Sequence, residues 1–138
     1  MKYTLAFFGV LLLAGCINTP AELVADAKSY DGEIRTDQTA QSAYRNLREA
    51  SRLCLESSPM GTPVTIESEF DPEVRGGQIT QRMIAQGVRM SISIIDVSQK
   101  TGSSPIINLY TLKSLSVYGI NRPTLENISR WVAGGKSC

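Results

Sequence analysis

The sequence of 138 residues contains no histidine and only three cysteines. Without histidine, a serine or cysteine nucleophile lacks its commonest general base, and the chain has neither a G-x-S-x-G nor an S-x-x-K motif. We therefore expect a non-enzymatic protein with no cofactor and no metal ion.

The chain also lacks an excess of charge of either sign, with 14 basic and 13 acidic residues. This balance gives no electrostatic reason to expect nucleic acid as a partner. The GGKS stretch at 134–137 is only superficially similar to a phosphate-binding loop. The glycine that such a loop needs is replaced by Arg130, so no nucleotide is expected.

Long apolar runs are absent except near the start, where residues 5–14 follow Lys2. The run is too short for a membrane-spanning helix and is typical of a secretory signal. It ends in Leu13-Ala14-Gly15-Cys16, which resembles the lipobox of bacterial lipoproteins. The resemblance implies a signal peptide over 1–15, removed by cleavage before Cys16. It also implies that Cys16 carries a diacylglycerol and an N-acyl chain, which together anchor the protein stably to a membrane.

The residue after the cysteine is Ile17, whereas enterobacterial lipoproteins retained in the inner membrane carry aspartate there. The resemblance therefore implies the outer membrane, on its periplasmic side, with the inner membrane as the alternative. Residues 16–36 lack sustained periodicity and contain Pro20, so we predict a lipidated N-terminus followed by a flexible tether. A short helix over 21–28 is an alternative within this segment.

The two remaining cysteines, Cys54 and Cys138, would lie in an oxidising compartment, where paired cysteines form disulfides. Two thiolates in a chain without histidine cannot complete a zinc site. A structural disulfide between them is predicted; free thiols and intermolecular pairing are the alternatives.

Residues 37–138 are predicted to form one periplasmic domain. Apolar residues at spacings of three and four predict a helix over 37–57, with Thr36 or Asp37 as its cap. Its apolar stripe comprises Ala40, Ala43, Tyr44, Leu47, Ala50, Leu53 and Cys54. Strands are predicted over 63–70, 78–85, 88–97 and 106–112, the second being the least regular. A last helix begins at Asn121-Arg122-Pro123, buries Leu125, Ile128 and Val132 with Trp131 beside them, and stops at Gly134-Gly135.

These elements predict an α+β fold: a two-layer sandwich of helix, three or four antiparallel strands and helix, with both helices on one sheet face. This order can bring Cys138 back to the end of the first helix. The layout resembles small uncharacterised lipoproteins of proteobacteria, which pair a cysteine late in the first helix with one at the extreme C-terminus.

Two groups of charged residues are candidate sites. Arg45, Arg48 and Arg52 form a basic ridge on the first helix that suits lipid phosphates, lipopolysaccharide or peptidoglycan carboxylates. The alternative is a solubilising face, with Arg52 and Glu56 as an ordinary helical ion pair. Glu67 and Glu69 share one side of a strand, which suits a weak calcium site or, more simply, a solvated face.

The expected function is that of a membrane-anchored, envelope-associated structural or accessory protein. Its partners would be the membrane, through the lipid anchor, and an envelope protein, peptidoglycan or lipopolysaccharide. The alternative is a periplasmic binding or inhibitor module for a peptide or glycan, using the sheet face or the arginine ridge.

Overall fold

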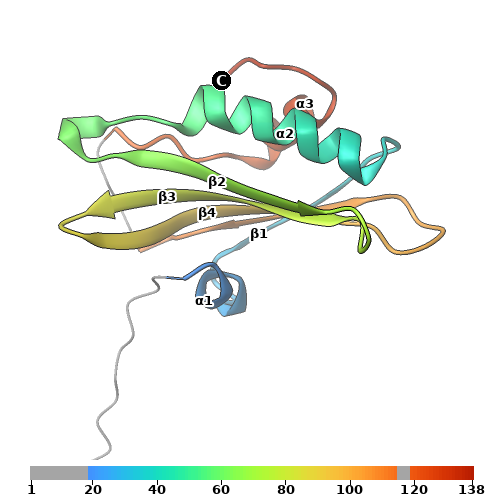
Figure 1. Ribbon diagram of the computed structural model, residues 1–138, viewed down its shortest axis with the longest axis horizontal. Helices are drawn as coiled ribbons and strands as arrows, with labels where there is room; N and C mark the ends of the chain where they lie inside the picture. Colours follow the sequence, from blue (N-terminus) through green and yellow to red (C-terminus); the bar gives the residue numbers. More distant parts are fainter. Residues whose placement is uncertain (1–18, 115–118) are drawn as a thin grey trace, which may run out of the picture.

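The computed structural model describes residues 19–114 and 119–138, which form one five-stranded antiparallel sheet with three α-helices (Figure 1). The predicted signal peptide and Cys16 lie outside these residues. The elements are α1 (Pro20–Ala25), β1 (Tyr30–Arg35), α2 (Ala40–Leu55), the short 3-10 turn η1 (Pro59–Gly61), β2 (Val64–Asp71), β3 (Gly76–Ala85), β4 (Val88–Ser98), β5 (Ile106–Thr111) and α3 (Leu125–Val132). The strands lie in the order β1-β5-β4-β3-β2, which makes β1 and β2 the two edges.

Helices cover both faces of the sheet (Figure 1). α2 and α3 pack on one face, and the main core lies between them and the sheet. α1 lies on the opposite face, where Leu23 is fully buried against Ile94 and Leu112. This apolar cluster, separate from the main core, explains why the short helix α1 packs on this face.

The predicted α+β class with an antiparallel sheet is confirmed, but the finer arrangement is not. The sheet has five strands where three or four were predicted. The chain order is helix, strand, helix, four strands and helix, and the extra elements come from the segment before α2.

The predicted flexible tether is wrong for its described part, because Pro20–Ala25 form α1 and Tyr30–Arg35 form β1; the alternative of a short helix in this segment is confirmed, although the helix ends at Ala25. Thr19 caps α1 through a reciprocal capping box with Glu22. Buried Ser29 follows the helix, its hydroxyl donating to the Leu23 carbonyl, and its own carbonyl accepts from Thr111 N at 2.8 Å. β1 then pairs with β5. The folded domain therefore includes the residues from Thr19 onward and does not begin at residue 37.

Two details of the predicted helices also change. α2 begins after Thr39, whose hydroxyl accepts from Ser42 N, and Leu53 leaves the buried stripe with 63% of its surface exposed. α3 begins after Thr124 and buries Ile128, Trp131 and Val132, whereas Leu125 of the predicted stripe is only partly buried. The predicted glycine stop is confirmed: Gly134 has φ +93° and donates to the Trp131 carbonyl.

The predicted alternation along the third expected strand is wrong, because β4 buries an unbroken run, residues 91–95. Its register against β3 shifts between Gln81 and Arg82, where a bulge adds one residue on the β4 side. Ser93 consequently faces the core, where its hydroxyl donates to the side chain of the fully buried Gln81.

The predicted disulfide is confirmed: Cys54 and Cys138 are bonded, with their Cα atoms 5.3 Å apart. Cys54 lies in the last turn of α2, and the tail after α3 returns to it. Lys136 in this tail lies 3.2 Å from Glu49, and Trp131 Nε1 donates to the Ser137 carbonyl at 2.9 Å. The last residues are therefore fixed along α2 and α3.

Candidate functional site

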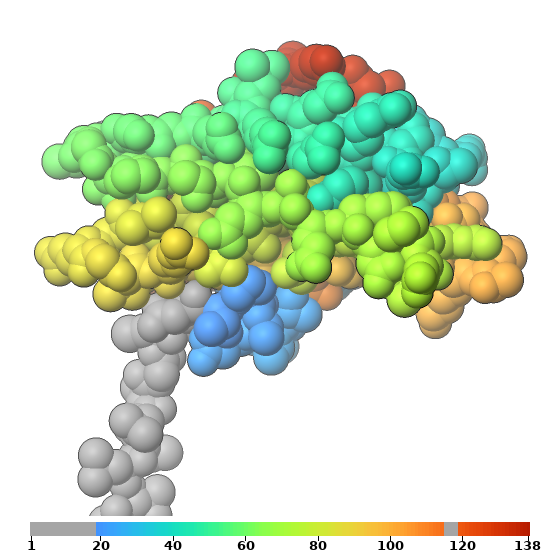
Figure 2. All heavy atoms as spheres, viewed as in Figure 1, coloured from blue at the N-terminus to red at the C-terminus, as the bar shows by residue number. Residues whose placement is uncertain are grey.

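A groove runs beside the N-terminal half of α2, over the end of β2 and the turn into β3. It consists of two adjoining hollows of about 420 and 350 Å³, which share Thr39, Gln41 and Phe70 in their walls. In the space-filling view, atoms of the turn (yellow-green) lie beneath the start of α2 (teal) (Figure 2). We refer to these two hollows together as the arginine groove, for the residues described next.

The floor of the groove is aromatic. The rings of Tyr44 on α2 and Phe70 on β2 contact each other, with centroids 4.9 Å apart. Gly77 on β3 lies directly below: a Cβ atom there would come within 2.8 Å of the Phe70 ring and 2.9 Å of the Tyr44 ring. Glycine thus permits the close packing of both rings on the sheet.

Three arginines line the groove. Arg45 and Arg48 lie in the wall of the larger hollow, and Arg75 lies in the wall of the smaller one. The structure therefore places two of the three ridge residues at the groove and leaves Arg52 outside it. Arg75 was missed from sequence, since its position in a turn does not indicate that the turn folds back beside α2.

The acidic residue of α2, Glu49, and the acidic residue that caps its C-terminal end, Glu56, are engaged elsewhere. Glu49 pairs with Lys136, and the side chain of Glu56 accepts from Ile66 N at 3.4 Å. The predicted Arg52–Glu56 pair is not formed. Within residues 19–114 and 119–138, none of Arg45, Arg48 and Arg75 makes an ion pair, so each guanidinium can bind an anionic ligand without first giving up a carboxylate partner.

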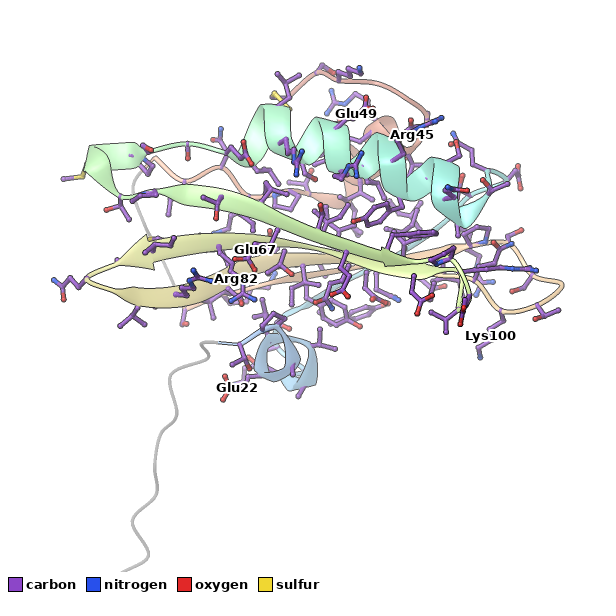
Figure 3. The ribbon with its side chains drawn as sticks, viewed as in Figure 1. Glu22, Arg45, Glu49, Glu67, Arg82 and Lys100 are labelled. Atoms are coloured by element: carbon purple, nitrogen blue, oxygen red, sulfur yellow. A yellow bond between two sulfur atoms is a disulfide. The ribbon has the colours of Figure 1, made fainter. Side chains whose placement is uncertain are left out.

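The two glutamates of the predicted acidic strand lie on the other face of β2. Glu67 Oε2 is 2.6 Å from Arg82 Nε, and Glu67 Oε1 is 3.8 Å from the Arg89 guanidinium. Figure 3 shows Glu67 and Arg82 together on the sheet, with Arg45 beyond β2 on the α2 side. Glu69 projects on the same face as Glu67 and has no ion-pair partner among the residues that the structure describes. Across the same residues, no group of three or more acidic or thiol side chains is arranged to hold a metal ion.

One more titratable pair lies on the outer sheet face, beside the cluster around α1. Burial raises the pKa of Asp96, although a hydrogen bond from the Asn108 side chain partly opposes this effect. Burial also raises the pKa of Tyr110, with the charges of Asp96 and Tyr30 adding to the shift. Neither Asp96 nor Tyr110 lines the arginine groove.

Comparisons with known proteins add no relative: no protein-family model, no curated protein and no solved structure matches the chain. Across the described ranges, the structure contains no helix of the length and apolar character needed to cross a membrane.

Proposed function

We propose that this chain is a non-enzymatic lipoprotein, anchored by Cys16 to the periplasmic side of the outer membrane, whose domain binds an anionic component of the envelope. The anchor is supported by the Leu13-Ala14-Gly15-Cys16 motif. The binding role is supported by the arginine groove. A peptide or glycan with carboxylates fits this groove as well as an envelope protein does.

The observation that carries the proposal is the set of three arginines without acidic partners around an aromatic floor. An arginine gains most from a carboxylate or phosphate that it can contact with two parallel hydrogen bonds. The floor formed by Tyr44 and Phe70 supplies apolar contact beneath that charge. A purely solubilising face would need neither the hollow nor the aromatic rings.

The folded domain begins close to Cys16, and this short distance helps to indicate which anion the groove binds. Only two residues separate Cys16 from Thr19, a span of about 10 Å at full extension. A lipid on Cys16 would therefore hold the α1 side of the domain against its own membrane. The groove beside α2 belongs to the opposite layer (Figure 1). This favours a ligand in the periplasmic space over the phosphates of the anchoring membrane.

The groove is tested by photocrosslinking in intact cells from position 41, since Gln41 lines both hollows. We expect discrete crosslinked products that disappear when Arg45→Glu and Arg48→Glu are combined. Arg52→Glu is the matched control, because it reverses the same charge on the same helix outside the groove. If the products persist in the double variant, or disappear equally in the control, the groove is not the binding site.

The anchor is tested separately by membrane fractionation. The unchanged protein should be found with the outer membrane, and Cys16→Ser should release the protein into the soluble fraction or leave it unprocessed. A processed Cys16→Ser protein that still fractionates with the outer membrane would show that lipidation is not the anchor.

A further inference from the structure

The free edge of β2 lies beside the arginine groove. In an antiparallel sheet, successive residues direct their backbone groups alternately to the two sides of a strand. On β2 the parity is fixed by two contacts: Val64 exchanges hydrogen bonds with Ser57, away from β3, while the Pro63 carbonyl accepts from Ile84 N on β3. Even-numbered residues of β2 therefore direct their amide and carbonyl groups toward the free edge.

The first part of this edge is already occupied. Ser57 covers Val64, and the Glu56 carboxylate covers the amide of Ile66. Farther along, the outward amide and carbonyl groups of Ser68 and Phe70 have no hydrogen-bond partner among the described residues. The ladder with β3 is unbroken at these positions, so the edge has no bulge there.

The opposite edge of the sheet differs. β1 has a register shift between Tyr30 and Gly32, and irregularities of this kind protect an edge from pairing with another chain. The open, regular edge is thus the one that borders the groove. The ring of Phe70 lies in the groove floor and its amide faces the free edge, so one ligand can contact the groove and the strand edge at the same time.

The two faces of the β2 edge carry opposite charges. Side chains of an added strand would alternate between the α2 face, which presents Arg45 and Arg48, and the outer face, which presents Glu69, since Glu67 is already paired with Arg82. A second copy of this chain is a poor occupant, because antiparallel pairing of two β2 edges would bring arginines toward arginines and glutamates toward glutamates. The complementary strand has acidic side chains on one face and basic side chains on the other.

We propose that the arginine groove and the β2 edge together bind an extended polypeptide segment with alternating acidic and basic residues, which adds to the sheet as a sixth strand beside β2. The backbone of the segment bonds to Ser68 and Phe70, its acidic side chains enter the groove, and its basic side chains face Glu69. This rests on the proposed function of the groove and specifies the class of its ligand.

The test uses the full chain purified in detergent and a fluorescent, end-blocked peptide of about seven residues that alternates aspartate and lysine, long enough to cover the free edge. A peptide of the same composition, with its aspartates and lysines grouped, is the control ligand. The key variant is Ser68→Pro, which removes an amide that faces the edge and leaves the ladder with β3 intact. Ser68→Thr is its matched control.

We expect the alternating peptide to bind more tightly than the grouped one. Ser68→Pro should weaken its binding by about tenfold or more, and Ser68→Thr should change it less than about twofold. Combined Arg45→Glu and Arg48→Glu should also weaken binding. In the unchanged protein, saturating peptide should slow hydrogen exchange at the amides of Ser68 and Phe70, a readout that does not depend on any variant folding.

The other outcomes separate the two proposals. If the arginine variants weaken binding but Ser68→Pro does not, or if exchange at Ser68 and Phe70 is unchanged, strand addition is wrong and the anion-binding groove stands. The same holds if soluble peptidoglycan fragments bind and Ser68→Pro has no effect on them. If the alternating peptide binds no better than the grouped peptide, strand addition is also wrong. If neither kind of variant alters binding, both proposals are wrong.

Discussion

The ring of Tyr44 lies 4.9 Å from the ring of Phe70 between centroids, and this contact joins α2 to the edge strand β2 at the floor of the arginine groove. Tyr44 is buried in the main core, whereas Phe70 is partly exposed and packs against it. One contact therefore belongs both to the core and to the candidate site. A substitution that displaces either ring should therefore alter both the stability of the domain and ligand binding.

The clearest such change is Gly77→Ala. The added methyl group would lie 2.6 Å from the Glu69 carbonyl oxygen as well as against both rings, and the backbone oxygen cannot move away as a flexible side chain can. We expect a loss of about 1–3 kcal/mol in the free energy of unfolding, the range for overpacked sites. Urea denaturation measures the loss. Gly87→Ala is a control for the loss of a glycine at a site with no neighbour within 4 Å, although its φ of +77° adds strain of its own. An unchanged stability in Gly77→Ala would contradict the packing described.

The second prediction concerns the bond between Cys54 and Cys138, which are 84 residues apart. A crosslink over so long a loop restricts the unfolded chain, so replacing both cysteines by serine should lower the free energy of unfolding by about 2–4 kcal/mol. Urea denaturation of the double variant and of the oxidised protein measures the difference. The single variants should match the double variant once intermolecular pairing is blocked. Equal stability of the oxidised and double-serine proteins would contradict this prediction.

Sequence periodicity predicted the parts of the fold whose buried residues repeat regularly. The stripe of α2 and the strand at β2 are of this kind, and the disulfide followed from the number of cysteines and their expected compartment. The helix and strand before α2 were not predicted as parts of the domain, because both are short and would be only marginally stable by themselves. α1 buries mainly Leu23, and β1 is interrupted at Gly32, whose φ is +143°. Both form because they complete a sheet and an apolar cluster assembled by distant residues.

The candidate site was predictable only in part for the same reason. Helical spacing placed Arg45, Arg48 and Arg52 in one row, but spacing alone cannot show where a neighbouring turn will fold. The hollow depends on Arg75 and Phe70, which reach it through the pairing of β2 with β3. The charge balance of the ridge also depended on tertiary contacts, since Lys136 comes from the far end of the chain to pair with Glu49.

A third prediction concerns Arg75, which has φ +50° although it is not glycine. That conformation costs about 1–2 kcal/mol for a residue with a Cβ atom. Arg75→Gly should therefore be more stable than Arg75→Ala by about 1 kcal/mol, while both lose the same charge from the groove. Thermal or urea denaturation measures the stability difference. Titration with the alternating peptide should show equally weakened binding in both, and a selective loss in only one variant would assign the effect to the turn backbone instead of the charge.

The last prediction concerns the pH dependence of stability and Asp96. Burial raises its pKa above the ordinary value of 3.8, which means that the folded protein holds this proton more tightly than the unfolded chain does. Stability should consequently fall as pH rises from 3.8 through the folded-state pKa, and the deficit should persist at neutral pH. Asp96→Asn removes the titrating group, so it should be more stable than the unchanged protein at neutral pH and lose that advantage in acid.

Urea denaturation between about pH 3 and pH 7 measures this difference at each pH. Asp37→Asn is the control. Asp37 is exposed and precedes α2, so this substitution removes the same charge from a site that is not buried. Asn108 is kept unchanged in both proteins. Its hydrogen bond favours the ionised carboxyl of Asp96 and therefore reduces the gain in stability expected from Asp96→Asn at neutral pH. If Asp96→Asn parallels the unchanged protein across the whole range, burial of this carboxyl does not weaken the fold. If it is less stable at neutral pH, the hydrogen bond with Asn108 outweighs the desolvation of the charge.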